Sequence, residues 1–352
     1  MFSYKKNIFF VFSIVFILLV LTATTVFLID PLQHYRKAKF YKIYSFEERY
    51  LSWGLLKNYN YDSILVGTSM TENFRKNYVD NDLNLDILRV PFSGSSAHEE
   101  NLIIQYALEN QQLSTIVYGL DLFSFRGDET RLRYGEGSLP LYLINDKTLD
   151  DFKYLLNIDI FFKDNLKILL SNFLGLKKDK IDFNKFWNWD YKYKFSKELC
   201  IKSYKESLKQ NSKDNYKIEE LKKSFDYNIL SLYKKNPNLK FEIFFPPYSI
   251  LTWKYWEHKK YLQNMLEFKE YIMRQSVKYN NVKIYDLQIS KYITHDLNNY
   301  KDLSHYSGKI NKWIIKQMKD DNYLVTENNI DEYLKKLKKQ IENYEPLADS
   351  NR

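Results

Sequence analysis

Cysteine is almost absent from this 352-residue sequence, which contains only Cys200. One thiol cannot form an intramolecular disulfide, and it cannot supply the several cysteines that many zinc sites use. Glycine and proline are also scarce, at 9 and 7 residues, and we find no internal repeat or low-complexity linker. No nucleic-acid-binding motif occurs. We therefore expect no metal, no cofactor and no nucleic-acid partner.

The chain is basic and rich in aromatic residues, with a net charge of +9 and 17% aromatics. Its lysines are scattered among glutamate and aspartate, a pattern typical of solvated helix faces. Codon bias favours tyrosine, lysine, asparagine and isoleucine together in AT-rich genomes, and it accounts for most of the aromatics more simply than a binding role does.

A long uncharged run, Ile8 to Ile29, is sufficient to cross the hydrocarbon core of a bilayer as a helix. A cleaved signal peptide is the alternative, but its apolar core is normally shorter and ends at a small-x-small site. The run therefore predicts an uncleaved single-pass anchor. Basic residues precede and follow it in nearly equal number, so charge alone leaves the orientation open.

Short apolar runs alternate with amphipathic helical patterns through the rest of the chain, which predicts an α/β fold with a mostly parallel sheet. The expected strands are Tyr61–Val66, Leu85–Val90, Ser114–Leu120, Leu239–Phe245 and Val282–Leu287. The expected helices are Ser45–Leu56, His98–Leu108, Lys217–Lys234, Tyr261–Tyr279, Ser307–Met318 and Asp331–Asn343. The expected segments are an anchor (1–30), a connector (31–60), a catalytic domain (61–325) with an insertion at 124–212, and a charged tail (326–352).

Polar residues follow the predicted strands, at the sheet edge where α/β proteins bind ligands. Ser69 comes just after the first strand, where its hydroxyl would be exposed at a helix N-terminus, although many such serines only cap the helix. Gly94 follows the second strand and allows close backbone approach to an oxyanion, or simply a tight turn.

A carboxylate and a histidine lie three residues apart near the C-terminus, in Asp302-Leu303-Ser304-His305. Asp302 could orient the imidazole of His305, which could then accept a serine proton. Such a pair is also common as a cap or a surface contact. His98 and His295 are the competing histidines, and we expect both to be structural.

The order of these residues along the chain resembles the SGNH hydrolase superfamily. The segments DSILVGTSMTENF and YKDLSHYSGKINKW carry the resemblance, which spans roughly Asp62 to Trp313. It is nearer still to the SGNH-like proteins of envelope modification, which act in alginate and peptidoglycan O-acetylation and in D-alanine transfer to teichoic acid. The resemblance implies a flavodoxin-like three-layer sandwich with a five-stranded sheet, and an extracytoplasmic catalytic domain.

Transferred residue by residue, the resemblance makes Ser69 the nucleophile, His305 the base and Asp302 its orienting carboxylate. It makes the backbone N–H groups of Ser69 and Gly94 oxyanion donors. The family's third block supplies an asparagine, but this chain has Asp121 there. An ionised carboxylate has no proton to donate, so Asp121 is either structural or protonated by burial. Losing one oxyanion donor costs about 100- to 1000-fold in rate.

Three further residues are candidates for substrate binding. Tyr248 follows the fourth strand and could line the pocket, and Trp187 and Trp189 in the insertion could stack on sugar rings. Buried tryptophan is the commoner alternative.

Acyl transfer, most simply acetyl transfer, to a cell-envelope polysaccharide through a Ser69 acyl-enzyme is the leading functional hypothesis. The resemblance implies a multi-spanning membrane protein of the membrane-bound O-acyltransferase type as the donor partner. A carbohydrate esterase uses the same intermediate and is the second hypothesis. The third is a non-catalytic assembly or binding factor, which the aspartate at position 121 favours.

Overall fold

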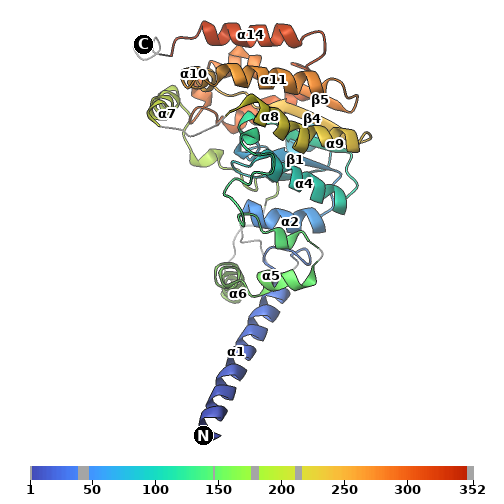
Figure 1. Ribbon diagram of the computed structural model, residues 1–352, viewed down its shortest axis with the longest axis vertical. Coiled ribbons are helices and arrows are strands. Elements are labelled where there is room, and N and C mark those ends of the chain that lie inside the picture. The colour runs from blue at the N-terminus through green and yellow to red at the C-terminus, as the bar shows by residue number, and fades with distance from the viewer. Residues whose placement is uncertain (1, 39–46, 146, 176–181, 211–215, 347–352) are drawn as a thin grey trace. The chain divides into compact units, whose positions relative to one another are not determined.

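The computed structural model describes residues 2–38, 47–145, 147–175, 182–210 and 216–346 (Figure 1). The chain divides into two compact units. The first, here called the anchor unit, comprises Met1–Asn60 and Glu136–Asp182, and the second, the sheet unit, comprises Tyr61–Gly135 and Phe183–Arg352. The stretch expected as a single insertion, residues 124–212, therefore contributes to both units.

A five-stranded, all-parallel sheet forms the centre of the sheet unit, and its strand order is β2-β1-β3-β4-β5. This is the strand order of flavodoxin-like folds. Each strand is one of the five short apolar runs, and β1 to β3 are buried throughout, as a parallel sheet covered on both faces requires. The strands are β1 Ser63–Gly67, β2 Ile87–Pro91, β3 Thr115–Gly119, β4 Lys240–Phe245 and β5 Val282–Asp286.

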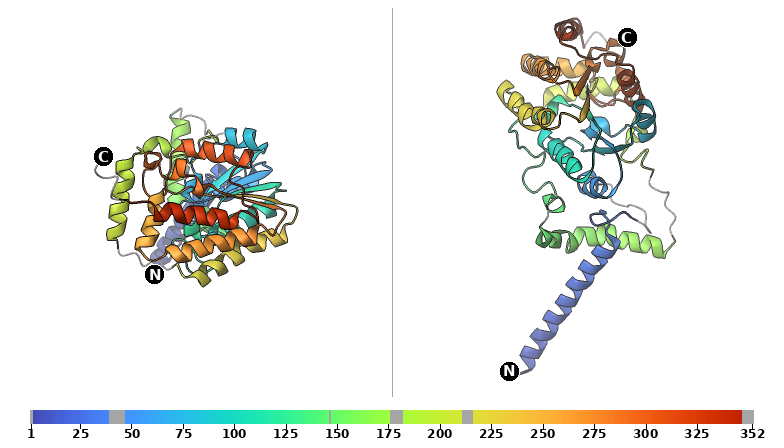
Figure 2. Two further views of the ribbon diagram at one scale, coloured as in Figure 1. Left: turned by 90° about the horizontal axis from the view of Figure 1, so that it is seen from above. Right: turned by 90° about the vertical axis from the view of Figure 1, so that its right-hand side faces the viewer.

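Helices cover both faces of this sheet (Figure 2). The chain steps from β1 to β2 in one direction and from β2 to β3 in the other, and right-handed crossovers then place α3 and α4 on opposite faces. Helix α3, Lys76–Leu83, packs against β2 and against α13, Gly308–Lys319. Helix α4, Ala97–Asn110, packs against β1 and α8, Ile218–Phe225, which in turn contacts α11, Leu262–Ser276.

The remaining α-helices of the sheet unit are α7 Lys197–Lys209, α9 Ser231–Lys235, α10 Ile250–His258, α12 Lys291–Thr294 and α14 Ile330–Glu342. The expected helix Lys217–Lys234 is interrupted by a π-helical turn, η7 Asp226–Leu230, between α8 and α9. The Asn228 side chain in that turn contacts the Glu129 and Ser224 carbonyls and the His98 ring. These polar partners compensate for the distorted helical ladder.

Two glycines at the carboxyl ends of neighbouring strands make room for the turn that follows β1. Gly67 and Gly119 are paired across β1 and β3. A Cβ atom on Gly67 would lie 2.8 Å from the carbonyl oxygen of Gly119, and one on Gly119 would lie 2.5 Å from Cγ2 of Thr71. A side chain at either position would therefore push away the turn that carries Ser69.

The anchor unit contains α1 Phe2–Ile29, α2 Glu48–Asn58, α5 Phe152–Leu155, the π-helix η5 Ile160–Asn165 and α6 Leu166–Phe173. Helix α1 has the length and composition of a single membrane span, and a signal sequence meets the same criteria. The first two residues of the expected helix Ser45–Leu56 lie outside the described residues.

The C-terminal end of α1 is part of the core of the anchor unit. Val26 and Ile29 are buried, and Ile29 packs against Ile168 of α6. The buried Asp30 carboxylate then accepts hydrogen bonds from the backbone N–H groups of residues 34, 35 and 36, at 2.8 to 2.9 Å. It also accepts one from the Tyr154 hydroxyl at 2.8 Å. The chain after α1 is thus folded tightly against α5.

Candidate active site

Ser69 begins a single 3-10 turn, η1 Ser69–Thr71, directly after β1. Thr68 precedes it as the N-cap, and its hydroxyl accepts a hydrogen bond from the N–H of Met70 at 3.2 Å. Because Gly67 can bring the backbone close to β3, the strand turns sharply here. The Ser69 side chain is left half-buried at the carboxyl edge of the sheet.

The structure places Ser69, His305 and Asp302 in one chain of hydrogen bonds, although Ser69 and His305 are 236 residues apart. The Ser69 Oγ lies 2.8 Å from the His305 Nε2. The His305 Nδ1 lies 2.8 Å from Oδ2 and 3.0 Å from Oδ1 of Asp302. A carboxylate at Nδ1 fixes the ring proton there, so Nε2 is free to accept the serine proton.

Asp302 is held in its charged form. Burial alone raises the pKa of Asp302, but the hydrogen bonds from His305 and the positive charge of Lys301 outweigh it, so its pKa lies below the ordinary value. Its Oδ1 accepts from the backbone N–H groups of Ser304 and His305 at 3.0 and 2.8 Å. The Lys301 ammonium lies 2.9 Å from Oδ2.

The loop that carries Asp302 and His305 is fixed from α10. The carbonyl of Leu303 accepts three hydrogen bonds, from the Ser249 backbone N–H at 3.2 Å, the Ser249 hydroxyl at 2.5 Å and the Thr252 hydroxyl at 2.7 Å. The buried Cys200 thiol donates to the Asp302 carbonyl at 3.2 Å. These hydrogen bonds hold the loop in place, and with it the Asp302 carboxylate and the His305 imidazole.

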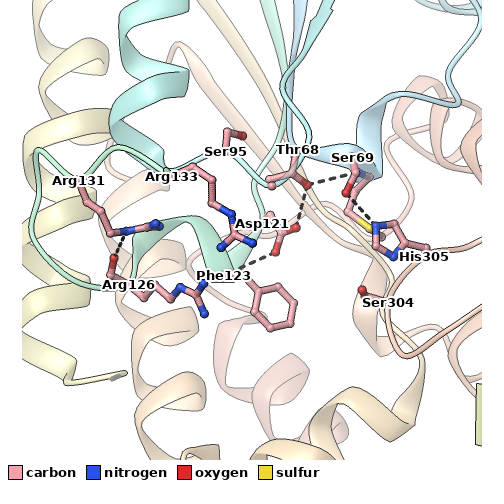
Figure 3. A pocket seen from close by; sticks show the side chains of 12 residues that line it. Thr68, Ser69, Ser95, Asp121, Phe123, Arg126, Arg131, Arg133, Ser304 and His305 are labelled. Carbon is pink, nitrogen blue, oxygen red and sulfur yellow. Dashed lines mark hydrogen bonds between the residues drawn. The ribbon is translucent and has the colours of Figure 1, made fainter. Parts of the chain in front are cut away.

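A pocket of about 260 Å³ opens in front of Ser69 (Figure 3). Its lining combines Ser69 and His305 with residues from the turns after β1, β2 and β3: Thr68, Ser69, Met70, Gly94, Ser95, Asp121, Phe123, Arg126, Arg131, Arg133, Ser304 and His305. Both expected oxyanion donors are in this set. Within the described residues, neither the Ser69 nor the Gly94 backbone N–H has a hydrogen-bond acceptor, so both are available to a ligand.

Asp121 lines the pocket, but its carboxylate already serves as an acceptor. Oδ2 accepts from the Thr68 hydroxyl at 2.9 Å, and Oδ1 accepts from the Tyr248 hydroxyl and from the Phe123 N–H. Burial, although opposed by these hydrogen bonds, raises the pKa of Asp121 above its ordinary value. Its visible role is to tie the turn after β1 to the turn after β3.

The three expected substrate-binding residues differ in their surroundings. Tyr248 is fully buried behind Asp121 and does not line the pocket. Trp187 lies against Phe186, with ring centroids 4.3 Å apart and the ring planes tilted by 42°. Trp189 contacts His305 edge-on, with ring centroids 5.5 Å apart, and the Lys301 ammonium lies 5.0 Å from the Trp189 ring centroid. Trp189 alone of the three stands beside the catalytic pair.

The two competing histidines lie elsewhere. The His98 Nδ1 contacts the Asn228 side chain at 3.2 Å, and His295 contacts Thr294 and the ring of Tyr344. Neither lines the pocket with Ser69. Among the residues that the structure describes, no group of three or more His, Cys, Asp or Glu side chains could hold a metal ion.

Sequence reasoning did not identify Arg126, Arg131 and Arg133, which enter the pocket from the segment after β3. The signal was present as three arginines within eight residues, RGDETRLR. It was obscured because Asp128 and Glu129 stand among them and give the segment the appearance of a mixed, solvated loop. The structure separates these charges, as described below.

A buried carboxylate supports the pocket from α4. Glu100 is fully buried and accepts hydrogen bonds from the hydroxyls of Ser95, Ser124 and Tyr118. Burial raises the pKa of Glu100 to about 8. Between its ordinary value of 4.5 and about 8, the folded protein binds a proton that the unfolded chain lacks.

The pH dependence of stability tests this assignment. Because only the folded state holds the Glu100 proton in this range, the free energy of unfolding should fall with rising pH, by up to about 1.4 kcal/mol per pH unit. Glu100→Gln should remove that contribution, whereas Glu109→Gln, exposed on the same helix, should retain it. Urea unfolding of the detergent-solubilised proteins from pH 5 to 8 measures how the free energy of unfolding of each depends on pH. An equal pH dependence in the wild type and in Glu100→Gln would contradict the assignment.

The described structure thus combines a parallel sheet, a serine directly after β1 and an aspartate–histidine pair in the segment after β5. No protein-family model matches the chain, and no curated protein matches its sequence. The chain's function is therefore argued from these residues and their contacts.

Proposed function

We propose that this protein is a membrane-anchored serine acyltransferase of the SGNH-like type that modifies a cell-envelope polysaccharide, most simply by O-acetylation. One observation carries the proposal: the hydrogen-bonded series from Ser69 Oγ through the His305 imidazole to the Asp302 carboxylate. Two unoccupied backbone N–H groups, of Ser69 and Gly94, line the same pocket. A nucleophile, a base with its orienting group, and oxyanion donors are the parts that acyl transfer needs.

In the first step, the Ser69 oxygen attacks the carbonyl carbon of the acyl donor while His305 Nε2 takes the serine proton. The carbonyl oxygen becomes an oxyanion that the two N–H groups stabilise. When the tetrahedral intermediate collapses, the donor's leaving group departs with the proton from His305, and the acyl group stays on Ser69. A sugar hydroxyl then attacks the acyl carbon and gives its proton to His305; as the acyl group moves to the sugar oxygen, Ser69 leaves and takes that proton back, which restores its hydroxyl.

The same acyl-enzyme gives an esterase if water is the acceptor. A carbohydrate acceptor follows from the resemblance; Trp189 contacts His305 edge-on, but Lys301 lies over its ring and Phe195 stacks on it, so Trp189 adds no free stacking face. The resemblance adds a multi-spanning membrane protein as the source of the acyl group. Asp121 is compatible with this mechanism as a structural acceptor, since the Ser69 and Gly94 N–H groups supply two donors without it.

We further propose that α1 is retained as a membrane anchor and that the sheet unit lies on the extracytoplasmic side. Removing α1 would take Val26 and Ile29 out of the core of the anchor unit and break up the contacts around Asp30. A cleavable leader normally makes no such contribution to the mature fold.

A reporter fused after Arg352 tests the orientation. Alkaline phosphatase at this position should be active, because the enzyme matures only where its disulfides can form. The matched fusion to β-galactosidase should be inactive. The opposite pattern, with an active β-galactosidase, would place the sheet unit in the cytoplasm and overturn the envelope assignment.

Covalent labelling of Ser69 tests the chemistry. The full-length protein should form a fluorophosphonate adduct on Ser69, located by peptide mass spectrometry, and should release acetyl from an activated acetyl ester. Ser69→Ala should lose the adduct and at least about 10⁴-fold in turnover, because the nucleophile is gone. Ser207→Ala, on α7 and outside the pocket, is the matched control.

The distribution of products then separates the alternatives. With a sugar acceptor present, most acyl groups should appear on the sugar for a transferase, and as free acid for an esterase. A protein that forms no adduct on Ser69 and turns over as slowly as Ser69→Ala is a non-catalytic factor, and the proposal fails.

A further inference from the structure

Three arginines form one wall of the pocket that contains Ser69. Arg126, Arg131 and Arg133 all line it, and Figure 3 shows them extending from the segment after β3 on the side away from His305. A guanidinium presents several N–H donors in a plane that matches the oxygens of carboxylate and phosphate. Three of them in a pocket of about 260 Å³ are a large positive charge for a small volume.

The two acidic residues in the arginine segment do not pair with Arg131 or Arg133 within the described chain. Asp128 accepts from the N–H and hydroxyl of Thr130, and Glu129 pairs with Lys223 at 2.7 Å. Neither acid lines the pocket. Asp121 does line it, but its oxygens already accept from Thr68, Tyr248 and the Phe123 N–H.

The arginine segment is held in place before any ligand binds. The Arg131 guanidinium donates to the carbonyls of Arg126 at 2.7 Å and Ser124 at 3.2 Å. Its backbone carbonyl accepts from the Ser96 hydroxyl, and the Arg133 N–H donates to Glu99 at 3.2 Å. These contacts fix the segment to the N-terminus of α4. The conformational entropy of this segment is therefore lost on folding rather than on ligand binding.

The cluster lies beside the expected oxyanion site. A Cβ atom on Gly94 would be 3.4 Å from the Nε of Arg133, so the Arg133 side chain passes directly over this glycine. Burial, together with the positive charges of Arg126 and Arg133, lowers the pKa of Arg131 against the opposing charges of Glu99 and Glu100. Within the described chain, neither Arg131 nor Arg133 forms an ion pair with a carboxylate. The mutual repulsion of these charges would be relieved by a bound anion.

We propose that Arg126, Arg131 and Arg133 form a subsite for a phosphate or carboxylate group of the substrate that reacts at Ser69. The inference rests on the proposed function for the identity of the reacting group, but the anion subsite itself is a matter of binding. The substrate is thus an anionic carbohydrate polymer or an anionic acyl carrier, and a neutral glycan is a poor ligand.

Equilibrium binding to the Ser69→Ala protein tests the subsite without turnover. The probes are a short poly(glycerol phosphate), an oligogalacturonate and a neutral chitooligosaccharide of similar length. At least one anionic probe should bind roughly tenfold or more tightly than the neutral one, and added salt should weaken its binding. Tighter binding of the phosphate probe identifies phosphate as the preferred group, and the reverse identifies carboxylate.

Variants then locate the binding. Arg133→Gln should lose roughly tenfold in affinity for the preferred anion, and Arg133→Lys should lose less because it retains the charge. Arg75→Gln, an exposed arginine outside the pocket, is the matched control. Equal binding of the neutral probe, or an equal loss in Arg75→Gln, would overturn the proposal. A missing adduct on Ser69 overturns the proposed function alone, because this binding assay does not require catalysis.

A second, independent observation concerns the anchor unit. Its segment from η5 through α6 leaves large apolar side chains in the open, with exposed fractions of 60% for Phe162, 56% for Leu170 and 88% for Phe173. Leu174 is exposed as well. An apolar surface of this kind on a short helix marks an interaction site.

The position of this segment within the anchor unit indicates what covers it. Helix α1, apolar along its exposed length, contacts η5, and its last turn packs on α6 through Ile29 and Ile168. The η5–α6 segment therefore lies beside the end of the candidate membrane span, and Figure 1 shows α6 next to the end of α1. Lys163 is exposed on the same segment, as expected for a helix at an interface between lipid and water.

We infer that the η5–α6 segment lies in the surface of the bilayer that α1 crosses, with Phe162, Leu170 and Phe173 inserted among the lipids. Spin labels on single cysteines in a Cys200→Ser background test this with the full-length protein in vesicles of phosphatidylethanolamine and phosphatidylglycerol. Labels at positions 170 and 173 should be more accessible to oxygen than to a nickel chelate. A label at position 163, the control on the same segment, should show the reverse.

Two results would overturn the inference. Labels at positions 170 and 173 that are as accessible to nickel as the one at 163 would show that the face remains in water. Labels that exclude both reagents and broaden each other's spectra would show that a second copy of the chain covers the face.

Discussion

The hydrogen bond between Ser69 and His305 joins two segments separated by 236 residues, and the site depends on their meeting. Neither segment reaches the other by itself: β1 ends at Gly67, and the loop of His305 follows β5 at the far edge of the sheet. Parallel pairing brings all five carboxyl ends to one side, and the three donors on the Leu303 carbonyl then hold the loop. The hydroxyl of Tyr306 and the amide of Asn311 reach the Met70 carbonyl at 3.3 Å and fix the other partner. The geometry of the candidate site therefore depends on the arrangement of the whole sheet rather than on any one local motif.

Asp121 shows how an aspartate, in place of the asparagine of the resembled family, alters which groups in such a site can donate hydrogen bonds. A carboxylate cannot donate to an oxyanion, yet it accepts from Thr68, Tyr248 and the Phe123 N–H and so joins the turns after β1 and β3. In the proposed mechanism, negative charge on the reacting carbonyl would be stabilised by backbone N–H groups and by the field of the neighbouring arginines. Such a site would favour substrates that bring their own negative charge, because long-range attraction to a cationic wall acts on the whole substrate and not only on the reacting carbonyl.

Much of the sheet unit could be predicted because its signals are local. The five strands are short apolar runs ended by glycine, proline or a polar residue. The N-cap of α4, Ser96, and its capping-box partner Glu99 are only three residues apart in the sequence. Ser69 was identifiable because it stands next to the end of β1, and Asp302 and His305 because they lie three residues apart in the segment after β5. The π-helical turn at Asp226–Leu230 was not, because it depends on the contacts of Asn228 with distant residues. Neither was the difference between Trp187 and Trp189, which stand two residues apart in sequence but have different neighbours in space. The arginines were missed because the net charge beside them depends on whether Asp128 and Glu129 pair with them. In the structure, Asp128 contacts Thr130 and Glu129 contacts Lys223.

The compact turn around Asp30 has a consequence for how the enzyme would meet its substrate. Under the proposed function, and if α1 stays in the protein, the sheet unit would be confined to a thin layer at one membrane, where its search for substrate is limited by tether length rather than by the volume of the compartment. A polymer held in the same layer is then present at a high effective concentration. Under such conditions, weak intrinsic affinity for each sugar unit is sufficient, and rapid release lets one enzyme modify many positions along a single chain.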